Sequence, residues 1–230
     1  MMELRVEHLC KRYGGNAVLE NISFTAPVGL TRIEGVSGIG KTTLLRILLG
    51  LETADSGSIA PEALRWAAVF QEDRLLEGLD AEGNLRFVLG ANYDAAAARA
   101  LLEELGLGDV GQKKTRNYSG GMKRRLALAR ALLTPSDALA LDEPFTGLDP
   151  ANRGAALACI QRAAEEKIVL LAAHDVLTLP ESCASVFLYG CSVRPRYSPQ
   201  HTATRRRFKT SGAFCSYRLF RAFSSAHWKR

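Results

Sequence analysis

The apolar residues of this chain gather in short runs that are separated by polar stretches. Four runs have the length of a strand, at residues 30–33, 138–141, 168–173 and 185–189. The second and third are apolar throughout, which is typical of parallel strands that are covered on both faces. We therefore expect a mainly parallel sheet in the core.

Helical stretches lie between these strands. Residues 43–49 and 123–133 are rich in leucine and alanine, and residues 95–105 follow Asp94, a good N-cap, and stop at Gly106. Helices that alternate with strands predict an α/β fold in one compact unit over residues 1–190. The segment at about 80–134 is expected to form a small helical subdomain within that unit.

A glycine-rich loop joins the strand at 30–33 to the helix at 43–49. Its sequence is Gly35-Val36-Ser37-Gly38-Ile39-Gly40-Lys41-Thr42-Thr43, which fits the pattern G-x-x-x-x-G-K-[ST] in its required strand and helix context. The glycines let backbone N–H groups turn toward a β-phosphate, and the positive end of the helix faces the same anion. Lys41 reaches the β- and γ-phosphate oxygens, and the Thr42 hydroxyl is a ligand for Mg²⁺. The loop predicts binding of a nucleoside triphosphate.

Two adjacent carboxylates, Asp142 and Glu143, end the apolar run at 138–141. The carboxyl ends of strands are where α/β sheets bind their ligands. We expect Asp142 to hold Mg²⁺ through water and Glu143 to polarise the attacking water. Adjacent acids after a strand are also common in ordinary loops, so the pair takes its significance from the glycine-rich loop.

A second glycine pair, Gly120 and Gly121, follows Ser119 at the start of the helix at 123–133. Ser119 is a natural N-cap, and glycines at a helix start let backbone amides approach an anion closely. This element predicts a second phosphate-binding site, too far along the chain to belong to the first loop.

In this order the motifs resemble those of the ATP-binding-cassette (ABC) ATPases, and the resemblance extends from about residue 3 to 190. The matching residues are Tyr13 for the aromatic that stacks on adenine, residues 35–43 for the Walker A loop, Gln71 for the Q-loop, Ser119, Gly120 and Gly121 for the signature motif, Asp142 and Glu143 for Walker B, Asp149 for the D-loop, and His174 for the switch histidine. Taken singly, Tyr13 also suits a hairpin strand end, Gln71 a polar surface position, and His174 a strand end bonded to a carbonyl.

The resemblance implies a P-loop NTPase fold with an antiparallel β edge, and ATP and Mg²⁺ as ligands. It assigns catalysis to Lys41, Gln71, Glu143 and His174, and metal binding to Thr42, Gln71 and Asp142. Two copies of the chain would sandwich two ATP molecules head to tail, each site being completed by Ser119, Gly120 and Gly121 of the other copy. Asp149 would act across the same dimer while also capping a helix with Pro150 behind it.

A single cassette without a run of about 20 apolar residues or a secretory signal predicts a peripheral ATPase subunit at the cytoplasmic face of the cell membrane. Its expected partners are separate permease subunits, which would contact the helical subdomain, and indirectly a solute-binding protein. Residues 69–76 resemble importers of the nitrate, sulfonate and taurine type, so import of a small solute is expected. The alternative is a soluble cassette ATPase of repair, assembly or ribosome function, but the coiled-coil insertion, extra cysteine motifs or second cassette typical of that class are not visible. The sequence does not encode the transported substrate.

The signature motif departs from the family at Tyr118 and Met122, where leucine and glutamine are usual. The Ser-Gly-Gly core is intact, so activity is expected to survive. The five cysteines show neither metal-ligand spacing nor an even set, which predicts free thiols.

The positive charge of the chain belongs to its end. Ten Lys or Arg and no Asp or Glu lie beyond Gly190, which leaves 20 basic against 24 acidic residues before it. The net charge of +6 therefore gives no reason to expect nucleic-acid binding by the ATPase body. For residues 191–230 three interpretations stay open: a disordered basic extension, a membrane-surface contact, and a segment that was never selected, such as readthrough in a shifted frame.

Overall fold

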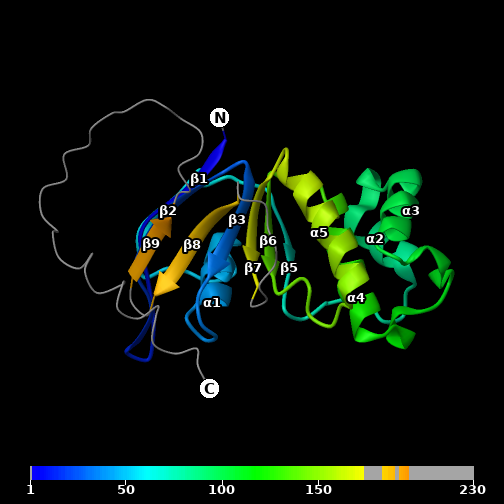
Figure 1. The fold of residues 1–230 in the computed structure, drawn as a ribbon, viewed down its shortest axis with the longest axis horizontal. Coiled ribbons are helices and arrows are strands. Elements are labelled where there is room, and N and C mark those ends of the chain that lie inside the picture. Colours follow the sequence, from blue (N-terminus) through cyan, green and yellow to red (C-terminus); the bar gives the residue numbers. More distant parts are fainter. Residues whose placement is uncertain (1, 174–182, 190–191, 197–230) are drawn as a thin grey trace, which may run out of the picture. The chain divides into compact units, whose positions relative to one another are not determined.

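The main sheet has six strands in the order β5-β6-β7-β3-β8-β9. The computed structural model describes residues 2–173, 183–189 and 192–196 of the chain. The strand bounds are β3 (Gly29–Glu34), β5 (Trp66–Val69), β6 (Ala138–Asp142), β7 (Ile168–Ala172), β8 (Ala184–Tyr189) and β9 (Ser192–Arg196). The first five are parallel to one another and β9 pairs antiparallel with β8 at the edge (Figure 1). The expected mainly parallel sheet is confirmed.

A second, antiparallel sheet has the order β2-β1-β4. It contains β1 (Glu3–Tyr13), β2 (Asn16–Pro27) and β4 (Ser56–Ala60). The turn from β1 to β2 is Gly14-Gly15, both with positive φ, as a two-residue hairpin turn favours. This sheet is the antiparallel β part of the fold that the family resemblance implied.

The helices divide into two groups. Helices α1 (Lys41–Leu48) and α5 (Pro150–Ala164) belong with the sheets, whereas α2 (Ala81–Leu89), α3 (Ala95–Glu104) and α4 (Gly120–Leu133) form a helical part that lies together at the far side from β1 and β2 (Figure 1). Three 3₁₀ turns connect these helices, at Gly90–Asn92, Gly108–Val110 and Thr115–Asn117. The helix starts follow from side-chain caps: Asp80, Asp94, Ser119 and Asp149 each accept hydrogen bonds from backbone N–H groups of the first turn.

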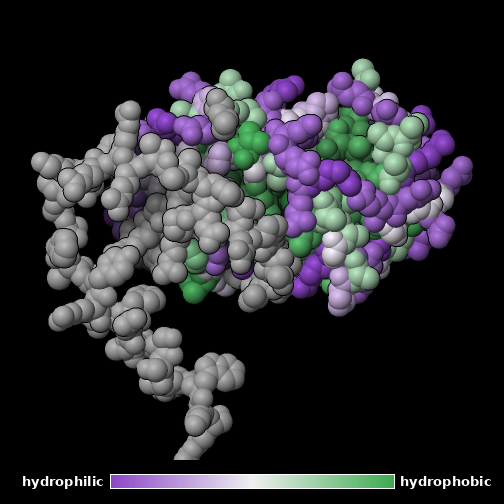
Figure 2. All heavy atoms as spheres, turned by 45° about the horizontal axis from the view of Figure 1, so that its top comes forward, coloured by the Kyte–Doolittle hydropathy of each residue, from purple (hydrophilic) through white to green (hydrophobic). Residues whose placement is uncertain are grey.

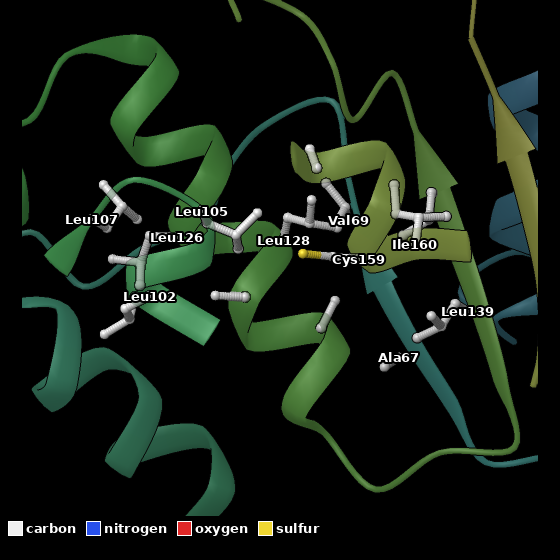
Figure 3. Close-up of a cluster of buried hydrophobic side chains, with 14 of the residues drawn as sticks. Ala67, Val69, Leu102, Leu105, Leu107, Leu126, Leu128, Leu139, Cys159 and Ile160 are labelled. Atoms are coloured by element: carbon white, nitrogen blue, oxygen red, sulfur yellow. The ribbon is translucent and has the colours of Figure 1, made fainter. Parts of the chain in front are cut away.

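The central strands bury both of their faces, which is why they are apolar throughout. Leu139, Leu141 and Leu171 point to a core shared with α2 to α5, part of which is drawn in Figure 3. The alternate residues Ala140 and Leu170 point to a second core, shared with α1, β1 and β2. The two cores fix the carboxyl ends of β3, β6 and β7 side by side, because register in a sheet that is buried on both faces is strongly specified.

The sheet extends further than the sequence suggested. Residues beyond 190 were expected to lack a strand, yet β9 reaches Arg196 and pairs with β8. An edge strand tolerates the proline at position 195 and needs no long apolar pattern, so the sequence signal for it is weak. The rest of the basic end, 197–230, lies outside the described residues, and so does His174.

On the face drawn in Figure 2, hydrophilic and hydrophobic residues are interspersed over short distances. Within the part of the chain that the structure describes, no helix is long and apolar enough to cross a membrane.

Candidate nucleotide-binding site

The loop between β3 and α1 encloses one side of a cavity of about 400 Å³. Ten residues line this cavity: Val18, Ser37, Gly38, Gly40, Lys41, Thr42, Thr43, Gln71, Asp142 and Glu143. They come from β2, the loop, the start of α1, the segment after β5, and the end of β6. The structure therefore brings together the glycine-rich loop, the acidic pair and Gln71; Thr42 and Asp142, which bond to each other, are 100 positions apart in the sequence.

Two glycines of the loop have a steric reason to be glycine. Gly40, the N-cap of α1, has φ 107°, and a Cβ there would lie 2.9 Å from Leu19 Cδ2 and 3.0 Å from Val18 O. Gly35 has φ 155°, and its Cβ would lie 2.7 Å from Ile39 Cγ2. The loop thus packs closely on β2 while the N-terminus of α1 opens into the cavity, an arrangement that suits an anion.

Lys41 is buried, and its ammonium lies across the loop. Nζ donates hydrogen bonds to the carbonyl oxygens of Gly35 (2.7 Å) and Val36 (3.2 Å). Burial lowers the pKa of Lys41 from its ordinary value, and the carboxylates of Glu143 and Asp142 oppose that shift. A cation held in this way is incompletely compensated by its neighbours and gains from a nearby anion.

The acidic pair has two different environments. Asp142 is buried at the end of β6, and its Oδ2 accepts a hydrogen bond from Thr42 Oγ1 at 2.8 Å. Glu143 has φ 51°, an uncommon value for a residue with a side chain, and its N–H donates to Ala172 O at 2.8 Å. This backbone bond to β7 holds Glu143 at the cavity wall.

Of the other predicted residues that the structure describes, none lines this cavity. Tyr13 ends β1 with 43% of its surface exposed and with Lys11 Nζ 5.0 Å from its ring centroid, but it does not line the cavity. Gly35, Val36 and Ile39 shape the loop without lining the cavity. Sequence reasoning missed Val18, whose only signal is its place on the strand after the Gly14-Gly15 turn.

The signature residues form a separate cluster with the D-loop. Ser119 and Gly120 are exposed at the start of α4, and neither they nor Gly121 line the cavity. A Cβ at Gly121 would lie 2.8 Å from Gly147 O, so this helix start packs directly on the segment before Asp149. His174, the remaining predicted residue, lies outside the described residues.

Comparison with known proteins defines the class. The model of the ABC transporter family matches residues 19–146. An aliphatic sulfonates import ATP-binding protein of Pseudomonas savastanoi pv. phaseolicola is 38% identical over 179 residues, which cover 76% of this chain and 75% of the relative. One from Rhizobium johnstonii is 40% identical, covering 72% and 66%. A solved structure of the ATP-binding subunit of an ABC transporter superimposes with a TM-score of 0.74 at 26% identity, covering 84% of this chain and 88% of that one.

The chain therefore belongs to the ABC transporter family of ATP-binding proteins. It is an ATPase subunit of the import type, and the expected similarity to the sulfonate, nitrate and taurine group is confirmed. None of these comparisons supports the alternative of a soluble, non-transport cassette ATPase.

Proposed function

We propose that two copies of this chain close head to tail around two ATP molecules and, from the cytoplasmic face of the membrane, drive import through separate permease subunits. One observation carries the dimer: Ser119, Gly120 and Gly121 lie outside the cavity that holds Lys41 in the same chain. Exposed amides at the start of α4 are suited to bind a phosphate group. The simplest source of that phosphate is an ATP molecule bound in the cavity of a second copy of the chain.

Mg²⁺ is part of the proposal, and the cavity fits it. Thr42 and Asp142 present a hydroxyl and a carboxylate oxygen 2.8 Å apart at the cavity wall, and both are hard ligands. The described residues contain no cluster of three or more His, Cys, Asp or Glu that would form an all-protein cage. Mg²⁺ usually keeps waters and phosphate oxygens as its other ligands, so two protein ligands suffice, with Gln71 as a further one. The metal would neutralise charge on the β- and γ-phosphates.

The roles of the remaining residues follow from their positions in the proposed complex. Lys41 would bind the β- and γ-phosphate oxygens, and Glu143 would orient the attacking water in line with the γ-phosphate. Gln71 and His174 would complete the catalytic set. Tyr13 would stack on the adenine base, and Asp149 would contact the opposite copy. Positioning and electrostatics supply nearly all of the catalysis in such a reaction.

For the transported solute we propose a small organic anion of the aliphatic sulfonate type, delivered by a solute-binding protein. The names of the relatives support this substrate class. ATP-dependent uptake of a labelled alkanesulfonate by vesicles that hold this chain with its copurified membrane subunits is the expected result. Uptake of a labelled sugar but not of the sulfonate would contradict the substrate class and leave the ATPase assignment intact.

The shared site is tested by mixing two inactive variants. In a heterodimer of Lys41→Ala with Ser119→Arg, one site carries both lesions and the other carries neither. Some ATPase activity is therefore expected to return on mixing. If heterodimers form, as native mass spectrometry would verify, and activity stays absent, the head-to-tail site is refuted.

A further inference from the structure

Helix α4 carries two arginines that hold the segment after β5. Arg124 is buried, with 5% of its surface exposed; its Nη1 donates to Phe70 O and its Nη2 to Gln71 O, both at 2.5 Å. Arg130, further along the helix, donates through Nη1 to Arg74 O (2.7 Å) and through Nη2 to Asp73 O (3.0 Å). Four backbone carbonyls within residues 70–74 thus accept hydrogen bonds from one helix.

The segment that they hold has no helix or strand of its own and is strained. Arg74 has φ 47°, a conformation that costs energy for a residue with a side chain. Its guanidinium lies 4.4 Å from the Phe70 ring centroid, so the segment turns back on itself. Strain of this kind persists only where the surroundings impose it, and the bonds from α4 do so.

The chemistry of the arginine–carbonyl contacts indicates that they orient residues 70–74 and do more than stabilise the fold. A guanidinium presents a planar fork whose two donors fix the direction of both acceptors, which an ammonium cannot do. Asp73 is the acid in this cluster, with Oδ1 3.2 Å from Arg124 Nη1. Burial lowers the pKa of Arg130 and raises that of Asp73, so the charges are costly where they lie. Retaining one buried and one half-buried cation to hold four carbonyls is consistent with a positioning role.

We propose that Arg124 and Arg130 form a clamp that positions Gln71 at the nucleotide cavity and ties that position to helix α4. The inference rests on the proposed roles of Gln71 and of the signature residues. Because Ser119 caps the same helix, a phosphate bound there by a second copy acts on the clamp through one rigid element. Arg124 and Arg130 are positioning residues, since they contact the backbone of residues 70–74 and do not line the cavity.

The test is a double-mutant cycle between Arg124→Lys and Gln71→Ala. Lysine keeps the charge and loses the fork, so kcat should fall about tenfold while the ATP Kd stays within twofold. In the Gln71→Ala background the same substitution should change kcat by less than twofold, because the group that the clamp positions is already absent. Melting temperatures of all four proteins are measured alongside.

Arg125→Lys is the matched control. Arg125 sits next to Arg124 on α4 and makes a comparable set of bonds, to Leu105 O, Gly106 O and Asn152 Oδ1, none of them to residues 70–74. Its effect on kcat should be equally large with and without Gln71. If the Arg124→Lys effect is also equal in both backgrounds, the clamp is refuted. If Gln71→Ala alone keeps wild-type kcat, the proposed role of Gln71 fails instead, which separates the two ideas. Should Arg124→Lys not fold, Arg130→Lys enters the same cycle and is judged by the same criterion.

Discussion

Replacing Lys41 by methionine separates two effects of this side chain, its effect on the stability of the folded chain and its contribution to nucleotide affinity. The ammonium is buried among loop carbonyls, and burial lowers its pKa. A charge-assisted hydrogen bond to phosphate contributes about 1.5–3 kcal/mol. Two unit charges about 4 Å apart attract by about 4 kcal/mol at an effective dielectric constant of about 20. A net loss of about 2–4 kcal/mol in binding corresponds to an ATP Kd that rises roughly 30- to 1,000-fold.

Although Lys41→Met should weaken ATP binding, it should leave the stability of the nucleotide-free protein unchanged or raise it. Methionine keeps most of the apolar stem and removes the desolvated cation, so the melting temperature is expected to stay equal or to rise slightly. The sign of the pH dependence follows from the lowered pKa. Between the folded and the unfolded pKa of Lys41 the unfolded chain binds more protons, so this group makes the wild type more stable as pH rises through that window. The variant should lack that increment.

Isothermal calorimetry with ATP is the assay, and Lys167→Met is the control. Lys167 is also a lysine whose pKa is lowered by burial, but its Nζ donates to Ser136 Oγ and Thr134 O, and it does not line the nucleotide cavity. Its replacement should leave the ATP Kd within twofold. An unchanged Kd in Lys41→Met, or an equal loss in both variants, would show that the cavity around the glycine-rich loop is not where the triphosphate binds.

Two further predictions concern turnover and the end of the chain. Glu143→Gln should keep ATP binding and lower kcat at least 100-fold, since it removes the carboxylate at the cavity wall and leaves the loop intact. Gel filtration of this variant with ATP should show a stable dimer. Wild-type turnover by the variant would refute the role assigned to Glu143. Truncation after Arg196 should preserve ATP affinity and melting temperature, because both cores and the cavity precede it. Truncation after Gly190 also removes β9 and should lower the melting temperature by several degrees; equal melting temperatures for both would contradict the contribution of β9.

The sequence was informative wherever a local rule acts. Continuous apolar runs predicted the central strands because both faces of β6 and β7 are buried. Asp94, Ser119 and Asp149 were predicted as caps because the capping bond joins residues two or three positions apart. The glycine-rich loop was predictable because its backbone conformation restricts the residues that fit.

What could not be predicted depends on contacts between distant segments. Val18 reaches the cavity only because the second sheet packs against the loop. Arg124 and Arg130 lie in a helical run whose charges look like an exposed face, since arginine is seldom buried. Their partners are backbone carbonyls, which carry no sequence signal. Tyr13 matched a family motif, yet the cavity of the single chain does not include it.

Helix α4 is the element through which these observations connect. The start of α4 packs on Gly147. Arg125, in the second turn of α4, donates a hydrogen bond to Asn152, and Asn152 in turn donates one to the carboxylate of Asp149. On the other side, Arg124 holds the backbone of Gln71 at the cavity. In the proposed dimer, phosphate bound at the start of α4 would shift this helix. The segment at 147–152 and the segment at 70–74 would then move as well, because guanidinium groups of fixed geometry bond each of them to α4. ATP in the opposite site would thus affect the position of Gln71 in this one, and cooperative hydrolysis would follow from a single rigid helix.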